Sequence, residues 1–123
     1  MSFNNILKGE YTEAENVMLE KHVPTIVILS GHGGDGNDLV RVIVGKEVAH
    51  PNTIEHHIAW IELYGVKQTG ESVNLGRMVL SPGNTIPDVS FKIEHIEEFK
   101  SFCALEYCNV HGVWEGSLDI TDL

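Results

Sequence analysis

The sequence lacks the features that mark several large classes of protein. Only 2 of its 123 residues are cysteines, which excludes the disulfide framework of small secreted domains. It has 8 Lys and Arg residues against 18 Asp and Glu residues, and the resulting net charge of −10 argues against nucleic acid and anionic membranes as partners. No apolar run approaches the length of a membrane span. We therefore expect a cytoplasmic globular protein.

The chain also lacks internal repeats, low-complexity stretches and linker-like segments. A chain of this length can bury about two-thirds of the surface that it exposes when unfolded, which is enough for a core without covalent support. We predict that residues 1–123 form a single domain.

Most of the chain has the composition of β-strands. Seven runs rich in β-branched and aromatic residues alternate with turn signals, at residues 24–30, 38–48, 54–66, 72–81, 88–97, 101–108 and 114–120. This spacing predicts an all-β fold, an antiparallel sandwich or barrel. One short helical segment is expected before it, because Thr12 and Glu15 form a capping-box pattern and Pro24 ends any helix by residues 22–23. The Gly-rich stretch at 31–38 is predicted to be a turn.

Seven histidines are many for this length, and most of them fall at strand ends or turns. Five potential metal donors share this placement, namely His22, His50, His56, Cys108 and His111. Side chains at strand ends from distant segments can converge on one ion. The C-x-x-H spacing of Cys108 and His111 allows one tight turn to present both donors, with backbone N–H groups hydrogen-bonded to the sulfur.

Each of these signals has an ordinary alternative when it is taken alone. A single C-x-x-H is weak evidence, because cysteine is often buried as a small apolar residue. His56 and His57 point to opposite faces of an extended chain, and periodicity does not choose between them. The Gly-rich stretch that contains His32 matches neither an EF-hand nor a P-loop, and His32 and His95 are interpreted as surface residues.

Three segments together resemble the superoxide reductase family: EKHVP (20–24), GKEVAHPNTIEHHIAWIEL (45–63) and YCNVHGVWEG (107–116). The resemblance is to the single-domain neelaredoxin type, which carries the iron centre of the desulfoferrodoxins. It implies a seven-stranded immunoglobulin-like β-sandwich or barrel that holds one mononuclear non-haem iron. It also implies the one-electron reduction of superoxide to hydrogen peroxide, in antioxidant defence.

The resemblance also assigns roles to individual residues. It implies that four imidazoles are equatorial ligands and one thiolate is axial, and these are His22, His50, His56, His111 and Cys108. The adjacent Glu20 and Lys21 match the family's Glu-Lys pair. Lys21 is then expected to attract the superoxide anion to the open position, and Glu20 to cap that position in the resting ferric state.

Two departures and three expectations accompany the resemblance. Ala49 stands where the family usually has proline before the second histidine, and no Cys-rich segment precedes residue 20, so no N-terminal Cys₄ iron domain is expected. Electrons should then come from a separate protein such as rubredoxin. A homotetramer is expected from resemblance alone, and superoxide is the expected substrate.

Two other classes of protein were weighed against this interpretation. A cupredoxin-like electron-transfer protein uses one Cys, two His and a weak axial Met, but no methionine follows His111 in this chain. A structural metal-binding module is a poor match, because structural zinc normally closes with four ligands.

Overall fold

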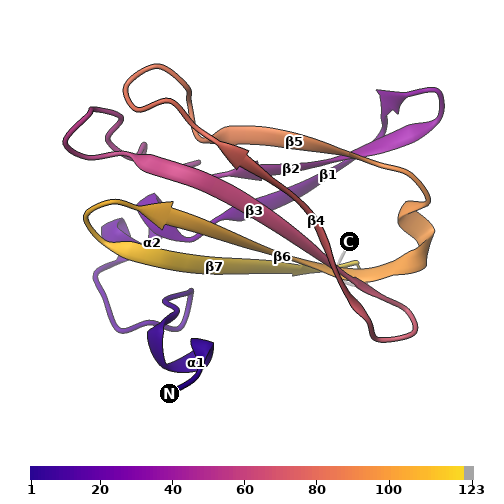
Figure 1. Cartoon of the computed structure of the whole chain (residues 1–123), viewed down its shortest axis with the longest axis horizontal. Coiled ribbons are helices and arrows are strands. Elements are labelled where there is room, and N and C mark those ends of the chain that lie inside the picture. Colours follow the sequence, from indigo (N-terminus) through magenta and orange to yellow (C-terminus); the bar gives the residue numbers. More distant parts are fainter. Residues whose placement is uncertain (121–123) are drawn as a thin grey trace.

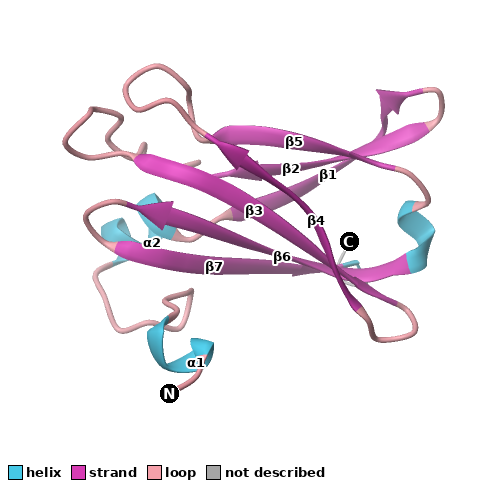
Figure 2. Cartoon of the chain, in the orientation of Figure 1, coloured by secondary structure: helices cyan, strands magenta, loops and turns pink. Residues whose placement is uncertain are grey.

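The computed structural model describes residues 1–120 and is almost entirely β-structure (Figures 1 and 2). The strands are β1 (Thr25–Gly34), β2 (Asn37–Ile43), β3 (Ile58–Lys67), β4 (Ser72–Val79), β5 (Asp88–Ile93), β6 (Phe99–Cys108) and β7 (Gly112–Asp119). Helical structure in these residues is limited to α1 (Phe3–Ile6), α2 (Asn16–His22) and the 3₁₀ turn η1 (Ile96–Glu98). No helix among the described residues is long and apolar enough to cross a membrane.

The strands form two antiparallel sheets that face each other. One sheet has the order β1-β2-β5, and the other has the order β4-β3-β6-β7. The predicted immunoglobulin-like sandwich is confirmed, with β4 paired to β3 instead of joining the first sheet as in a constant-type domain. The barrel alternative is wrong, because the described strands remain in two separate sheets.

The core lies between the two sheets and follows from the period of two along each strand. In β6, for example, Phe102, Ala104 and Cys108 point inward and are fully buried, whereas the residues that alternate with this inward-facing set are more exposed. Val40 and Val42 from β2 and Ile61 and Leu63 from β3 meet this face. Burial of these side chains stabilises the sandwich on which the strand-end loops are mounted.

Several element boundaries differ from the sequence-based expectation. The strand predicted at 38–48 ends at Ile43, the one predicted at 54–66 begins at Ile58, and the one predicted at 88–97 ends at Ile93. The α2 helix begins at Asn16, and the Thr12 hydroxyl instead accepts a hydrogen bond from the Gly9 N–H (2.8 Å), so the capping box is absent. The glycine-rich stretch is not one turn, because β1 continues to Gly34 through an irregular pairing and β2 starts at Asn37. The turn proper is thus reduced to two residues with positive φ, Asp35 and Gly36.

An unpartnered acidic side chain lies within the core. Glu106 of β6 is fully buried, and neither of its carboxyl oxygens has a hydrogen-bond partner among the described residues. Burial raises the pKa of Glu106 to about 9. The side chain is therefore a neutral carboxylic acid at pH 7.

This burial predicts how stability depends on pH. Between pH 4.5, the ordinary pKa, and about 9, folded Glu106 keeps a proton that the unfolded chain has lost, so the free energy of unfolding falls as pH rises. Against a Glu106→Gln variant, wild type should lose about 1.4 kcal/mol per pH unit across that range. Denaturant titrations of both proteins at several pH values measure the difference, and parallel profiles would contradict the assignment.

Candidate metal centre

Five side chains meet at one end of the sandwich, where α2, the β2–β3 connection and the β6–β7 turn come together (Figure 1). His22 is the last residue of α2, and His50 and His56 lie in the β2–β3 connection. Cys108 ends β6, and His111 lies in the turn that follows. Three segments far apart in the sequence thus supply the cluster, as their strand-end placement predicted.

The donor atoms are close enough to share one ion. One donor atom from each of His22, His50, His56 and Cys108 lies within 4.8 Å of all the others. The Nδ1 atom of His111 is 3.8 Å from the Cys108 sulfur, and the His22 and His111 rings are 4.8 Å apart. Five donors, four imidazoles and one sulfur, therefore surround one small volume.

Backbone carbonyls orient two of these imidazoles. The Nδ1 atom of His22 lies 2.8 Å from the Met18 carbonyl oxygen, and that of His50 lies 2.6 Å from the Pro51 carbonyl oxygen. A carbonyl only accepts hydrogen bonds, so each Nδ1 carries the proton and each Nε2 keeps a free lone pair. This arrangement of a supported imidazole is typical of metal-ligating histidines.

The imidazole donors suit a metal ion because two of their Nε2 atoms lack a hydrogen-bond partner in the described part of the chain and three of the rings are neutral at pH 7. The Nε2 atoms of His22 and His56 are buried and have no hydrogen-bond partner among the described residues. Burial lowers the pKa of His22 and His56, and it lowers that of His50 to about 4. Since metal binding requires deprotonated donors, three neutral imidazoles at pH 7 are already in the required form.

The sulfur is on the protein side of the cluster, and solvent is on the other side. Cys108 is 0% exposed and His22 is 1% exposed, whereas His56 and His111 are only partly buried. The cluster is therefore partly open to solvent at His56 and His111, where a small anion could approach.

The C-x-x-H turn supplies the expected hydrogen bond to sulfur. The backbone N–H of His111 donates to the Cys108 sulfur at 3.3 Å. Burial raises the pKa of the Cys108 thiol, while the backbone N–H groups of His111 and Val110 and the charge of Lys8 lower it. Burial outweighs these effects, so the pKa of the thiol lies above its ordinary value, and a metal bound at the sulfur would displace the thiol proton.

The second histidine of the adjacent pair holds the loop and does not join the cluster. The His57 ring nitrogen Nδ1 lies 3.0 Å from the Thr53 carbonyl oxygen, within the loop that carries His50 and His56. The backbone N–H of His57 donates to Asn109 Oδ1 at 2.8 Å, and Asn109 Nδ2 donates to the Glu55 carbonyl. Asn109 thereby joins the C-x-x-H turn to this loop. The structure thus places His56, and not His57, with the other donors.

The two predicted catalytic residues occupy the last turns of α2. Lys21 is partly buried. The pKa values of His22 and His56 are lowered mainly by the burial of these two histidines, and the positive charge of Lys21 lowers both further. Its ammonium therefore acts electrostatically on the cluster. Glu20 is exposed and makes no hydrogen bond to the donor residues. The surface histidines His32 and His95 are exposed, as expected.

Two residues that sequence reasoning missed support the cluster. The Trp114 ring stacks on His22 (4.9 Å between centroids, 24° between planes), and its Nε1–H donates to the His111 carbonyl at 3.2 Å. The position of Trp114, three residues after His111, could have indicated from the sequence that this side chain lies close to the cluster. Lys8 lies near the same carbonyl, and nothing in its local sequence indicated this.

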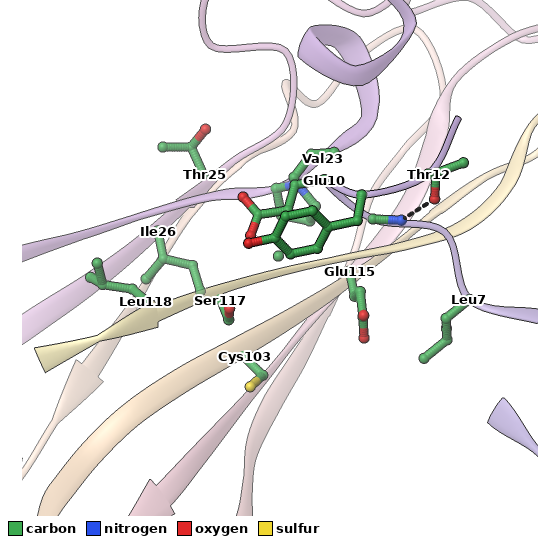
Figure 3. Close-up of a pocket in the computed structure, with 14 residues that line it drawn as sticks. Leu7, Glu10, Thr12, Val23, Thr25, Ile26, Cys103, Glu115, Ser117 and Leu118 are labelled. Atoms are coloured by element: carbon green, nitrogen blue, oxygen red, sulfur yellow. Dashed lines mark hydrogen bonds between the residues drawn. The ribbon is translucent and has the colours of Figure 1, made fainter. Parts of the chain in front are cut away.

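A cavity of about 710 Å³ lies apart from the cluster (Figure 3). It separates the N-terminal segment around Glu10 and Thr12 from the part of the sandwich that carries Cys103 and Ser117. None of the five donor residues lines it.

Known proteins are similar to this chain in sequence and in fold. Residues 14–117 match the profile of the desulfoferrodoxin family. A superoxide reductase of Pyrococcus abyssi is 42% identical over 107 residues, covering 82% of this chain and 88% of the relative. A neelaredoxin of Megalodesulfovibrio gigas is 37% identical, with 80% and 85% covered.

The structural comparison agrees. A superoxide reductase (neelaredoxin) structure from Ignicoccus hospitalis superposes with a TM-score of 0.79 at 34% identity, covering 98% of each chain. The superoxide reductase structure from Giardia intestinalis gives a TM-score of 0.70 at 35% identity, covering 81% of this chain and 98% of that one. Sequence, fold and the cluster of donors lead to one assignment: the chain belongs to the desulfoferrodoxin family and is a superoxide reductase of the neelaredoxin type.

Proposed function

We propose that this protein is a superoxide reductase, which reduces superoxide by one electron to hydrogen peroxide. The observation that carries the proposal is the meeting of four imidazoles and one buried cysteine sulfur at a partly exposed strand-end site. The superoxide reductases among its relatives support the same reaction. Two protons are consumed for each superoxide reduced to hydrogen peroxide.

The residues proposed to hold one iron are His22, His50, His56, His111 and Cys108. Five donors exceed the four of a structural zinc site and the two-histidine set of a blue-copper site. The mixture of imidazole and thiolate suits iron, and the partly exposed side leaves a position for a small ligand. Bound there, ferrous iron supplies the electron.

The chain's own residues orient the donor atoms and attract the anion. The Met18 and Pro51 carbonyls fix the His22 and His50 rings, so the donor atoms are arranged before the substrate arrives. The buried Cys108 sulfur would donate electron density to a bound iron. Lys21 supplies positive charge that draws the anion to the partly exposed side of the site and orders water there for proton transfer.

A single-turnover experiment tests the proposal. Protein reduced and freed of excess reductant is mixed with a pulse of superoxide, and the absorption from thiolate to ferric iron is followed. The proposal predicts that this absorption appears at a rate proportional to superoxide concentration. A protein that stays reduced under these conditions would overturn it.

Lys21→Ala is expected to slow the reaction with superoxide and to weaken its dependence on salt. A unit charge about 4 Å from an anion contributes about 1 kcal/mol in water, which corresponds to roughly a fivefold rate effect. Stopped-flow rates across ionic strengths measure it. Lys100→Ala is the matched control, because Lys100 is exposed on β6 and the net charge change is the same. Equal slopes for both variants would exclude Lys21 from substrate attraction.

Several finer features remain part of the proposal. We propose that Glu20 caps the open iron position in the oxidised state, and that residues 1–123 act as one iron-binding domain. We also propose that the electron comes from a separate donor such as rubredoxin. A homotetramer in the cytoplasm completes this proposal, and it rests on resemblance.

A further inference from the structure

The N-terminal segment is fastened to the sandwich at Lys8. The Lys8 N–H donates to the Val113 carbonyl (3.2 Å), and the Glu115 N–H donates to the Lys8 carbonyl (2.7 Å), so Lys8 pairs with the outer edge of β7. Elsewhere the segment is loosely packed. Phe3 and Ile6, which precede Lys8, are exposed, and the cavity of Figure 3 lies beside the residues that follow Lys8. The backbone pairing therefore fixes where the Lys8 side chain can reach.

The Lys8 side chain reaches back to the C-x-x-H turn. Its Nζ lies 3.4 Å from the His111 carbonyl oxygen and 5.6 Å from the centroid of the Trp114 ring. The Trp114 Nε1–H donates to the same carbonyl at 3.2 Å. One ammonium and one indole thus hold a single carbonyl, and the cation also lies over the indole face.

This contact connects Lys8 with two of the proposed ligands. Lys8 contacts the backbone carbonyl of His111 directly. It is connected to His22 through Trp114, which is 1% exposed and stacked on the His22 ring. Among the described residues Lys8 forms no salt bridge with a carboxylate. Its charge is therefore not neutralised by an ion pair, and it acts next to the turn that carries both Cys108 and His111.

We propose that Lys8 is a positioning residue of the metal centre, which holds the C-x-x-H turn against Trp114 and raises the reduction potential of the bound iron. This inference rests on the proposed function in so far as the site holds iron. A fixed cation disfavours the oxidised centre more than the reduced one, because the oxidised centre carries one more positive charge. Lys8 thus makes the oxidised protein easier for its electron donor to reduce.

The test compares reduction potentials of the iron-loaded proteins by equilibrium redox titration, without superoxide. Lys8→Met keeps the length of the side chain and removes the charge, whereas Lys8→Arg keeps the charge. Lys100→Met is the control for the same change in net charge at an exposed position on β6. In Lys8→Met, the equilibrium constant for reduction should fall about tenfold, equivalent to a decrease of about 59 mV for a one-electron couple. Lys8→Arg and Lys100→Met should keep the wild-type potential.

Three results would overturn the inference: an unchanged potential in Lys8→Met, an equal decrease in Lys8→Arg, or an equal decrease in Lys100→Met. The absorption from thiolate to iron, recorded for each variant, shows that the centre is loaded. Because the titration uses no superoxide, its outcome does not depend on superoxide reduction. Failure of the proposed function would appear in the experiments that use superoxide, such as the single-turnover experiment.

Discussion

Replacing Cys108 with serine is expected to remove both the thiolate-to-iron absorption and the reaction with superoxide. Cys108 is fully buried, with its sulfur 3.4 Å from His50 Nε2 and 3.3 Å from the His111 backbone nitrogen. Loss of an outer support of a metal ligand typically costs about 10–100-fold in affinity or activity, so loss of the sulfur itself should cost more than about 100-fold in rate. Absorption spectra and stopped-flow kinetics with superoxide measure the two effects.

Cys103→Ser is the matched control for this substitution. Cys103 lies on the same strand but faces outward and is exposed, outside the cluster. Its replacement should leave both the spectrum and the rate as in wild type. If Cys108→Ser kept the absorption, or if Cys103→Ser lost it, Cys108 would not be the sulfur donor.

Gly45→Ala is expected to weaken metal binding strongly by displacing His50. Gly45 has φ +80°, and a Cβ placed there would lie 2.5 Å from the His50 backbone nitrogen and 3.1 Å from the Val48 carbonyl oxygen. These neighbours are backbone atoms of the loop that presents His50, so the loop must move. We expect metal affinity to fall about 10–100-fold, the range for lost support of a ligand. Competition with a chelator measures this affinity.

Gly36→Ala separates displacement from backbone strain. Gly36 has φ +79°, close to that of Gly45, but a Cβ added at Gly36 would meet no heavy atom within 4 Å. Both variants should lose a similar part of their stability through the left-handed backbone, about 1–2 kcal/mol. Only Gly45→Ala should also lose metal affinity. Equal affinities for the two variants would show that the loop does not need this close approach.

The local strand signals predicted most of the fold. Runs rich in β-branched residues located all seven strands, because a half-buried pleated surface selects such side chains. β3 and β4 are consecutive and pair as a hairpin, whereas the pairing of β3 with β6 joins strands far apart in the chain and was not accessible from local pattern. The start of α2 was missed for a different reason, since Thr12 closes a turn onto Gly9 where a capping residue was expected.

The donor residues were easier to identify than the residues that support them. A metal requires specific side chains at strand ends, so the histidines and Cys108 stand out in the sequence. The role of Lys8 depends on pairing with β7 more than 100 residues later in the chain, which no local spacing reveals. Glu106 follows the strand alternation, but the burial of an unpartnered carboxyl emerges only from the packed sandwich.

The measurement that tests the central claim most directly is the stoichiometry of peroxide formation. Reduced protein, kept reduced by an electron donor that does not itself consume superoxide, is exposed to pulsed superoxide, and peroxide and oxygen are counted. A reductase gives one peroxide for each superoxide and releases no oxygen. One peroxide for every two superoxides, together with evolved oxygen, would show dismutation and contradict the function proposed for this site.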